Sequence, residues 1–160
     1  MFSENVQKIF DEIMADKENK EFTDAGIKPL FSAPQNAKVM IVGQAPGIKA
    51  QEARKYWFDK SGDLPPRKDF APKWHPRLLK ELPNIELIIL IGQYAQKYYL
   101  GDKEKKNLTE TVKAYKEYLP KLLPLVHPSP RNLIWLKKNP WFEEEVVPML
   151  QERIRGYLNK

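Results

Sequence analysis

The sequence predicts an α/β fold with three layers, α/β/α, around a short and mostly parallel central sheet of about three core strands. Three apolar runs support this prediction, at residues 39–42, 87–91 and 122–126, because each has the length and composition of a buried parallel strand. Segments with helical features alternate with these runs, as expected for a parallel sheet. The 160 residues can form one hydrophobic core, so we expect a single domain over residues 1–160.

The N-terminal part predicts a helix, a loop and the first strand. Ser3 can cap the helix. The apolar residues of this helix share one face at helical spacing: Val6, Ile9, Phe10, Ile13 and Met14. Residues 24–36 contain a glycine and two prolines, which predicts a loop. Strand 39–42 then runs into GQAPG (43–47), which predicts a tight turn.

The middle of the chain predicts less regular structure, followed by the second strand. Residues 48–74 carry several prolines and many charges without clear periodicity, and a short helix is expected over 75–82. Strand 87–91 ends at a glycine, and a helix is expected over 93–99. Asn107 and Glu110 have the spacing of a capping box, which predicts a helix to about residue 119.

In the C-terminal part, strand 122–126 runs directly into His127. Pro128 and Pro130 each restrict φ to about −65°, so the loop loses little entropy when it binds a ligand. A last helix is expected after Asn139, with Pro140 in its first turn. A later proline at position 148 should kink this helix or start a new segment.

Composition narrows the possible functions. The absence of cysteine excludes disulfides, thiolate metal sites and iron–sulfur clusters, and is consistent with the cytoplasm, where we expect the protein. No apolar run is long enough for a membrane span, and no signal peptide is recognised, so we expect no membrane association. The net charge of +6 is compatible with a polyanionic partner. No group of His, Asp and Glu has metal-ligand spacing, so we expect no metal.

Each predicted strand is followed by a turn motif: GQAPG (43–47), IGQYAQ (91–96) and VHPSPRN (126–132). Parallel strands place their carboxyl ends at one edge of the sheet, so a composite site is expected there. In this order and spacing, the motifs resemble the uracil-DNA glycosylase superfamily, and DLPPR (63–67) resembles a small prokaryotic subgroup of it. The resemblance covers most of the chain. It implies hydrolysis of the N-glycosidic bond of uracil in DNA without a cofactor, and we expect a monomer.

The resemblance implies a role for each motif residue. His127 would donate a hydrogen bond to the uracil oxygen that becomes negative as the bond to the sugar breaks. Gln44 would position the base or a water molecule. The substrate-binding residues would be Gly43, Ala45, Pro46, Gln93 and one of the aromatic residues Trp57 and Phe58. The DNA-binding residues would be Ser129, Arg131 and Asn132, whose hydroxyl, guanidinium and amide groups suit a phosphate backbone. Arg131 stands where many members carry an apolar wedge.

The chain departs from the family pattern in two places. Ala45 stands where the most active members have a catalytic Asp, and loss of such a base typically lowers the rate about 10²–10⁴-fold. Three other carboxylates could replace it, and the spacing selects none of them: Asp24, Asp59 and Asp63. The other departure is in the middle of the chain. No apolar run lies between the strand that ends at residue 42 and the strand that starts at residue 87, so the base-reading strand of the family is missing. Trp57 or Phe58 could stack on the base or cover the surface that this strand would bury.

Several alternatives remain open at the level of sequence. His127 could be a structural histidine bonded to its own loop, and GQAPG could be a simple turn. His75 is assigned no role. The lysines of two basic clusters could form a solvated face or, if they share a face with Arg131, a DNA footprint: Lys103, Lys105, Lys106, Lys137 and Lys138. The chain as a whole could be a degenerate superfamily member that binds DNA without cleaving it, or an α/β protein with an unrelated ligand.

Overall fold

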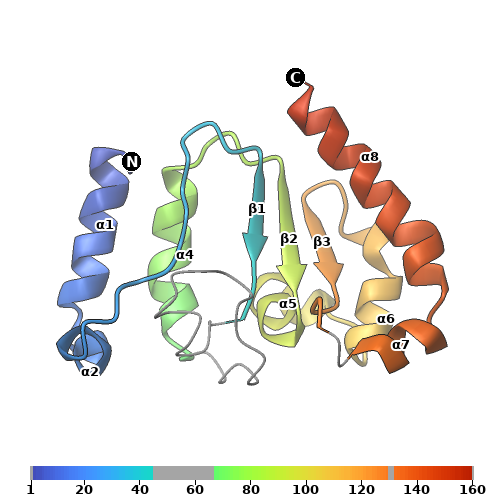
Figure 1. The fold of residues 1–160 in the computed structure, drawn as a ribbon, viewed down its shortest axis with the longest axis horizontal. Coiled ribbons are helices and arrows are strands. Elements are labelled where there is room, and N and C mark those ends of the chain that lie inside the picture. Colours follow the sequence, from blue (N-terminus) through green and yellow to red (C-terminus); the bar gives the residue numbers. More distant parts are fainter. Residues whose placement is uncertain (1, 45–66, 130–131, 160) are drawn as a thin grey trace. The chain divides into compact units, whose positions relative to one another are not determined.

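A computed structural model describes residues 2–44, 67–129 and 132–159 (Figure 1). Its contacts divide the chain into two compact units. The first comprises residues 1–37 and 44–85, and the second comprises residues 38–43 and 86–160. The second unit combines a three-stranded parallel sheet with helices, which confirms the predicted α/β class. That residues 1–160 act as one domain stays a prediction.

The sheet of the second unit has the strand order β1-β2-β3, and neighbouring strands are parallel (Figure 1). The strands are β1 (Val39–Val42), β2 (Leu87–Ile91) and β3 (Leu122–Leu125). In the register, β1 Val42 is level with Leu90, and Ile91 is level with Leu125. The three predicted strands are therefore confirmed, and the third ends one residue earlier than expected.

The core of the second unit lies against one face of the central strand. All five residues of β2 are buried, and its alternate residues Leu87, Ile89 and Ile91 join one hydrophobic cluster. The other buried members come from β3, from the residue after it and from the helical segments: Val112, Tyr115, Leu123, Leu125, Val126, Phe142 and Val146. A central strand buried along its whole length explains why it appears in the sequence as an unbroken apolar run.

Helices α5 (Gln93–Leu100) and α6 (Leu108–Lys113) connect β2 to β3 in the chain, with a 3₁₀ turn between them. The predicted cap of α6 is present, because the Asn107 side chain accepts a hydrogen bond from the Glu110 backbone N–H at 2.9 Å. The helix does not continue to residue 119 as predicted. Tyr115 is buried in the core, and the Tyr118 hydroxyl donates to the Lys103 carbonyl at 2.9 Å. These tertiary contacts hold the next turn in 3₁₀ geometry.

The C-terminal part contains α7 (Leu133–Lys138), a π-helical turn over Phe142–Val146 and α8 (Val147–Leu158). Pro148 lies in the first turn of α8, so the predicted new segment is confirmed. The side chain of Asn139, the predicted cap, instead donates to the Trp135 carbonyl at 2.8 Å and accepts from the Trp141 indole at 3.2 Å. Helix α7 was not predicted.

The first unit is helical in its described part: α1 (Glu4–Ala15), a 3₁₀ turn, α2 (Lys20–Asp24) and α4 (Phe70–Lys80). Ser3 caps α1 as predicted. Helix α4 begins at Phe70, earlier than the predicted residue 75, because Pro72 falls in the first turn, where no backbone N–H has a helical partner. Glu12 of α1 and Arg77 of α4 form an ion pair at 2.5 Å. Among the described residues, no helix is long and apolar enough to cross a membrane.

Candidate functional site

The carboxyl ends of the three parallel strands lie at one edge of the sheet (Figure 1). Gly43 follows β1, Gly92 follows β2, and Val126 and His127 follow β3. The second unit therefore brings three of the predicted site residues to the same edge, namely Gly43, Gln93 and His127. In open α/β sheets this edge is where ligands bind.

The turn after β2 depends on Gly92. This residue has φ +82° and ψ 171°, a backbone conformation that residues with a Cβ rarely adopt. Its N–H donates to the Leu125 carbonyl of β3 at 3.0 Å, and its carbonyl accepts from the Gln96 N–H at 3.2 Å. A Cβ built on Gly92 would meet no atom within 4 Å, so the backbone conformation, and not space, requires glycine. The turn leaves Gln93 exposed in the first turn of α5.

The loop after β3 folds back onto the backbone carbonyl of His127. This oxygen accepts from the Ser129 N–H at 2.9 Å and also from the side-chain amide of Asn132. The Asn132 N–H in turn donates to the Ser129 carbonyl at 2.8 Å. His127 is half-exposed at the edge of the sheet. The loop thus presents a histidine on a backbone held by its own hydrogen bonds, and one donor of the predicted DNA contact Asn132 is used within the loop.

Helix α7 fixes the far end of this loop. The Trp135 indole N–H donates to the Thr109 hydroxyl of α6 at 2.8 Å, and its ring lies edge-on to Trp141 and Phe142. These contacts orient the helix so that Leu133 and Ile134 are 59% and 69% exposed. Two neighbouring aliphatic side chains therefore project from the first turn of α7, directly after the loop. This exposed pair could not be predicted from the sequence, because the apolar residue type alone does not distinguish an exposed side chain from a buried one.

The remaining predicted site residues are placed as follows. Gln44 follows Gly43 in the chain, is half-buried, and belongs to the first unit. Asp24, one candidate for the missing carboxylate, forms an exposed ion pair with Lys20 at 2.7 Å. The other candidates lie outside the described residues: Ala45, Pro46, Trp57, Phe58, Asp59, Asp63 and Arg131.

The lysines of the two basic clusters are all exposed. Lys105 is paired with Glu117 of the turn after α6 at 2.5 Å, and this hydrogen bond raises the pKa of Lys105. Lys137 and Lys138 occupy the last turn of α7, the helix that carries the exposed aliphatic pair. Positive charge therefore lies on the same short helix as Leu133 and Ile134.

Arg67, the last residue of DLPPR, is a structural anchor within the first unit. Its guanidinium donates to the Glu18 carbonyl at 2.6 Å, to the Asn19 side chain at 2.7 Å and to Asp69 at 2.7 and 3.0 Å. A second cation, Lys73, bonds the buried Asp16 at 2.7 Å. This hydrogen bond, above all, lowers the pKa of Asp16. The cluster holds the start of α4 against the end of α1.

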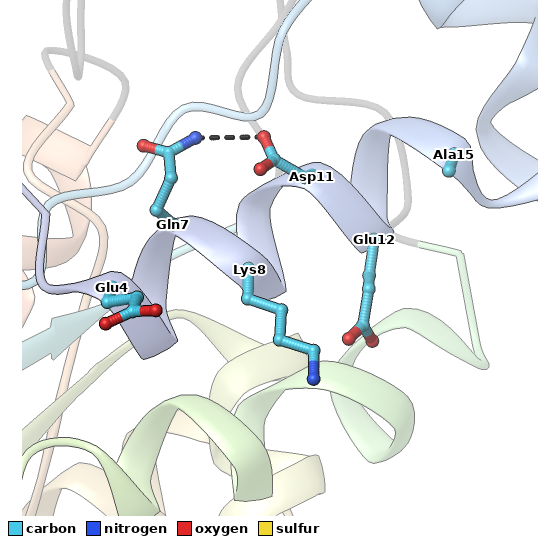
Figure 2. A pocket seen from close by; sticks show the side chains of 6 residues that line it. All are labelled: Glu4, Gln7, Lys8, Asp11, Glu12 and Ala15. Atoms are coloured by element: carbon cyan, nitrogen blue, oxygen red, sulfur yellow. Dashed lines mark hydrogen bonds between the residues drawn. The ribbon is translucent and has the colours of Figure 1, made fainter.

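A shallow hollow of the first unit lies on one side of α1 (Figure 2). It is lined by six residues of that single helix: Glu4, Gln7, Lys8, Asp11, Glu12 and Ala15. Within it the Gln7 amide donates to Asp11 at 2.9 Å. None of the predicted site residues lines this hollow, so it does not bear on the site at the sheet edge. In the described ranges no three His, Asp or Glu side chains are grouped to hold a metal ion.

The second unit is an open parallel α/β sheet whose turns carry glycines and a histidine at the carboxyl edge. A family model described as the uracil DNA glycosylase superfamily matches residues 63–151, more than half of the chain. The chain therefore belongs to the uracil-DNA glycosylase superfamily, as the motifs predicted. The matched range contains β2, the turn at Gly92, β3 and the His127 loop, while β1 and GQAPG precede it.

Proposed function

We propose that this protein is a DNA repair glycosylase that hydrolyses the N-glycosidic bond of uracil in DNA. The observation that carries the proposal is the position of His127. It is half-exposed at the carboxyl edge of a parallel sheet, on a loop closed by three hydrogen bonds, in a chain of the uracil-DNA glycosylase superfamily. In this proposal residues 1–160 form one catalytic domain, which acts as a monomer.

The proposed reaction depends more on a hydrogen-bond donor that stabilises the leaving base than on a general base that activates water. As the bond from uracil to the sugar carbon C1′ breaks, positive charge grows on the sugar and negative charge on the uracil oxygen. A ring N–H of His127 that donates a hydrogen bond to that oxygen stabilises the leaving base. Water then adds to C1′, and the proton that it loses passes to the departed uracil anion, which leaves a sugar hydroxyl and neutral uracil. Gln44 can orient this water, but an amide accepts no proton at neutral pH. Because Ala45 supplies no carboxylate, slow turnover is expected.

Uracil in a duplex must leave the base stack before it can react, which costs a few kcal/mol of unstacking. In the proposal, Ser129, Arg131 and Asn132 hold the backbone, and Gly43, Pro46 and Gln93 line the base site with Trp57 or Phe58. The space that the extruded base leaves in the duplex must then be filled by a side chain. Leu133 and Ile134 are suited to this role, because they are exposed, apolar and directly follow the loop. Arg131, stacked on the neighbouring bases, is the alternative filler.

The direct test is release of free uracil from a single-stranded oligonucleotide that contains one uracil. His127→Ala should abolish release. His75→Gln is the matched control, because His75 lies half-buried in α4, where burial lowers its pKa, and has no role in the proposal. Circular dichroism should show both variants folded. If the wild-type protein releases no uracil, or if His127→Ala releases it at the wild-type rate, the proposal is wrong.

A second function, DNA binding without base release, is favoured by one observation: Ala45 replaces the carboxylate of the most active superfamily members. The expected signature is binding that weakens steeply with salt, because phosphate contacts release counterions, with no uracil freed. Fluorescence anisotropy between about 50 and 200 mM salt, run beside the release assay, distinguishes this function from the first.

A further inference from the structure

The side chain of Gln96 is completely buried beneath the candidate site. Gln96 belongs to α5, and its amide nitrogen donates to the Leu125 carbonyl at 2.8 Å and to the Leu90 carbonyl at 3.3 Å. Leu90 is in β2, and Leu125 is the last residue of β3. One side chain therefore joins the ends of two neighbouring strands at the edge where the site lies.

The orientation of this amide follows from its surroundings. Both groups in contact with the nitrogen are carbonyl oxygens, which accept hydrogen bonds only, so the opposite orientation would place three acceptors together. The Gln96 oxygen finds no donor in the part of the chain that the structure describes. A buried acceptor without a donor destabilises the fold. A leucine or methionine would fill the space without this cost, so the donors of Gln96 are the feature that distinguishes it.

The bond to Leu125 acts close to the histidine. Leu125 precedes His127 by two residues, and its carbonyl accepts a second hydrogen bond, from the Gly92 N–H at 3.0 Å. Val126, between Leu125 and His127, is buried in the core cluster. The backbone entering the loop is thus held by α5 and by its N-terminal turn, and the backbone leaving His127 is held by Ser129 and Asn132.

We infer that Gln96 is a positioning residue for His127: its side chain sets the end of β3 and so the place of the imidazole relative to the turn after β2. The kinetic part of this inference rests on the proposed glycosylase function, and the structural part does not. Displacement of a reacting group by about 1 Å can cost about 10²-fold in rate. Loss of the anchor is therefore expected to slow base release without weakening DNA binding.

The test compares Gln96→Met, which keeps the length of the side chain but has no donor, with Lys97→Ala, a change of the neighbouring exposed residue of α5. Single-turnover uracil release should fall about ten- to hundredfold in Gln96→Met, while the affinity for an uncleavable oligonucleotide stays within about twofold. Amide hydrogen exchange at Val126, His127 and Ser129 should become faster, while that of α6 stays unchanged. Lys97→Ala should match the wild type in all three measurements.

A second variant keeps the test valid if Gln96→Met does not fold. Gln96→Glu places a buried carboxyl against two carbonyls, which raises its pKa, and the protonated form keeps one donor. Its activity relative to wild type should therefore be highest at low pH and fall as the pH rises. Wild-type release and exchange in both variants would overturn the inference. If the wild-type protein releases no uracil, the proposed function fails, and the exchange measurement still decides whether Gln96 anchors the loop.

Discussion

The side-chain amide of Asn132 donates a hydrogen bond to the backbone carbonyl of His127 and closes the loop after β3. Because the Ser129 N–H bonds the same oxygen, Ser129 and Asn132 are both tied to the backbone of the histidine. Asn132 thus holds the loop with one side-chain amide hydrogen, and its second amide hydrogen can make the DNA backbone contact of the proposed function.

Asn132→Asp should therefore lower uracil release about tenfold, because a carboxylate has the shape of the amide but no donor for the His127 carbonyl. The unfolding temperature should change little, since Asn132 is half-buried in a surface loop. Single-turnover assays and thermal unfolding measure the two effects. Asn159→Asp, at the end of α8, is the control for the added charge. Equal activity of the two variants would contradict a role for the hydrogen bond.

Replacing Leu133 and Ile134 together by serine should reduce release from duplex DNA by about tenfold or more, and release from single strands much less. Only the duplex must be unstacked and its gap filled. Both side chains are exposed, so the fold should tolerate the change. Leu158→Ser, at a side chain that is 79% exposed at the end of α8, is the matched control. A similar loss on both substrates would show that the pair does not act in base extrusion.

Gly92→Ala should lower the free energy of unfolding by about 1–3 kcal/mol, because the alanine Cβ is strained at φ +82°. Gly156→Ala provides the opposite control. Gly156 lies within α8, and a Cβ there meets no atom within 4 Å, so alanine should stabilise the protein by about 0.5–1 kcal/mol. Urea unfolding measures both. If the two substitutions change stability in the same direction, the turn after β2 does not require glycine.

Acid should destabilise the first unit through Asp16. The hydrogen bond from Lys73 lowers the pKa of this carboxyl in the folded state. The resulting stability is present above the unfolded pKa of about 4 and is lost as the pH falls through the lower folded value. Urea unfolding at a series of pH values should show this loss, and Asp16→Asn should remove it. Asp24→Asn, which breaks only an exposed ion pair, should leave the pH dependence close to wild type.

The sheet could be predicted from the sequence because its strands are short, apolar and bounded by glycine or charge. Leu87–Ile91 is buried along its whole length, so no polar residue interrupts it. The cap at Asn107 was also predictable, since a capping bond joins residues three apart in the chain. The end of α6 was not, because it is set by burial of Tyr115 and by the bond from Tyr118 to Lys103.

The candidate site, like the fold, could be predicted only in part. Placement of Gly43, Gln93 and His127 at one edge follows from the parallel order of three strands, which strand signals and turn motifs predict. The use of Asn132 within the loop, the exposure of Leu133 and Ile134, and the anchor at Gln96 could not be predicted. Each depends on which donor lies beside which carbonyl, or on which side of a helix the core covers.

The sequence alone determined the class of the protein, because local periodicity and turn chemistry act over a few residues and are written in the chain. It also determined the superfamily, because the order and spacing of the turn motifs can be recognised without a structure. Only the tertiary structure decided what holds His127 in place, because Gln96 and Leu125 are separated by 29 positions in the chain and meet only when β3 has docked beside β2. Contacts of that kind depend on the packed arrangement of the strands, which no local pattern encodes.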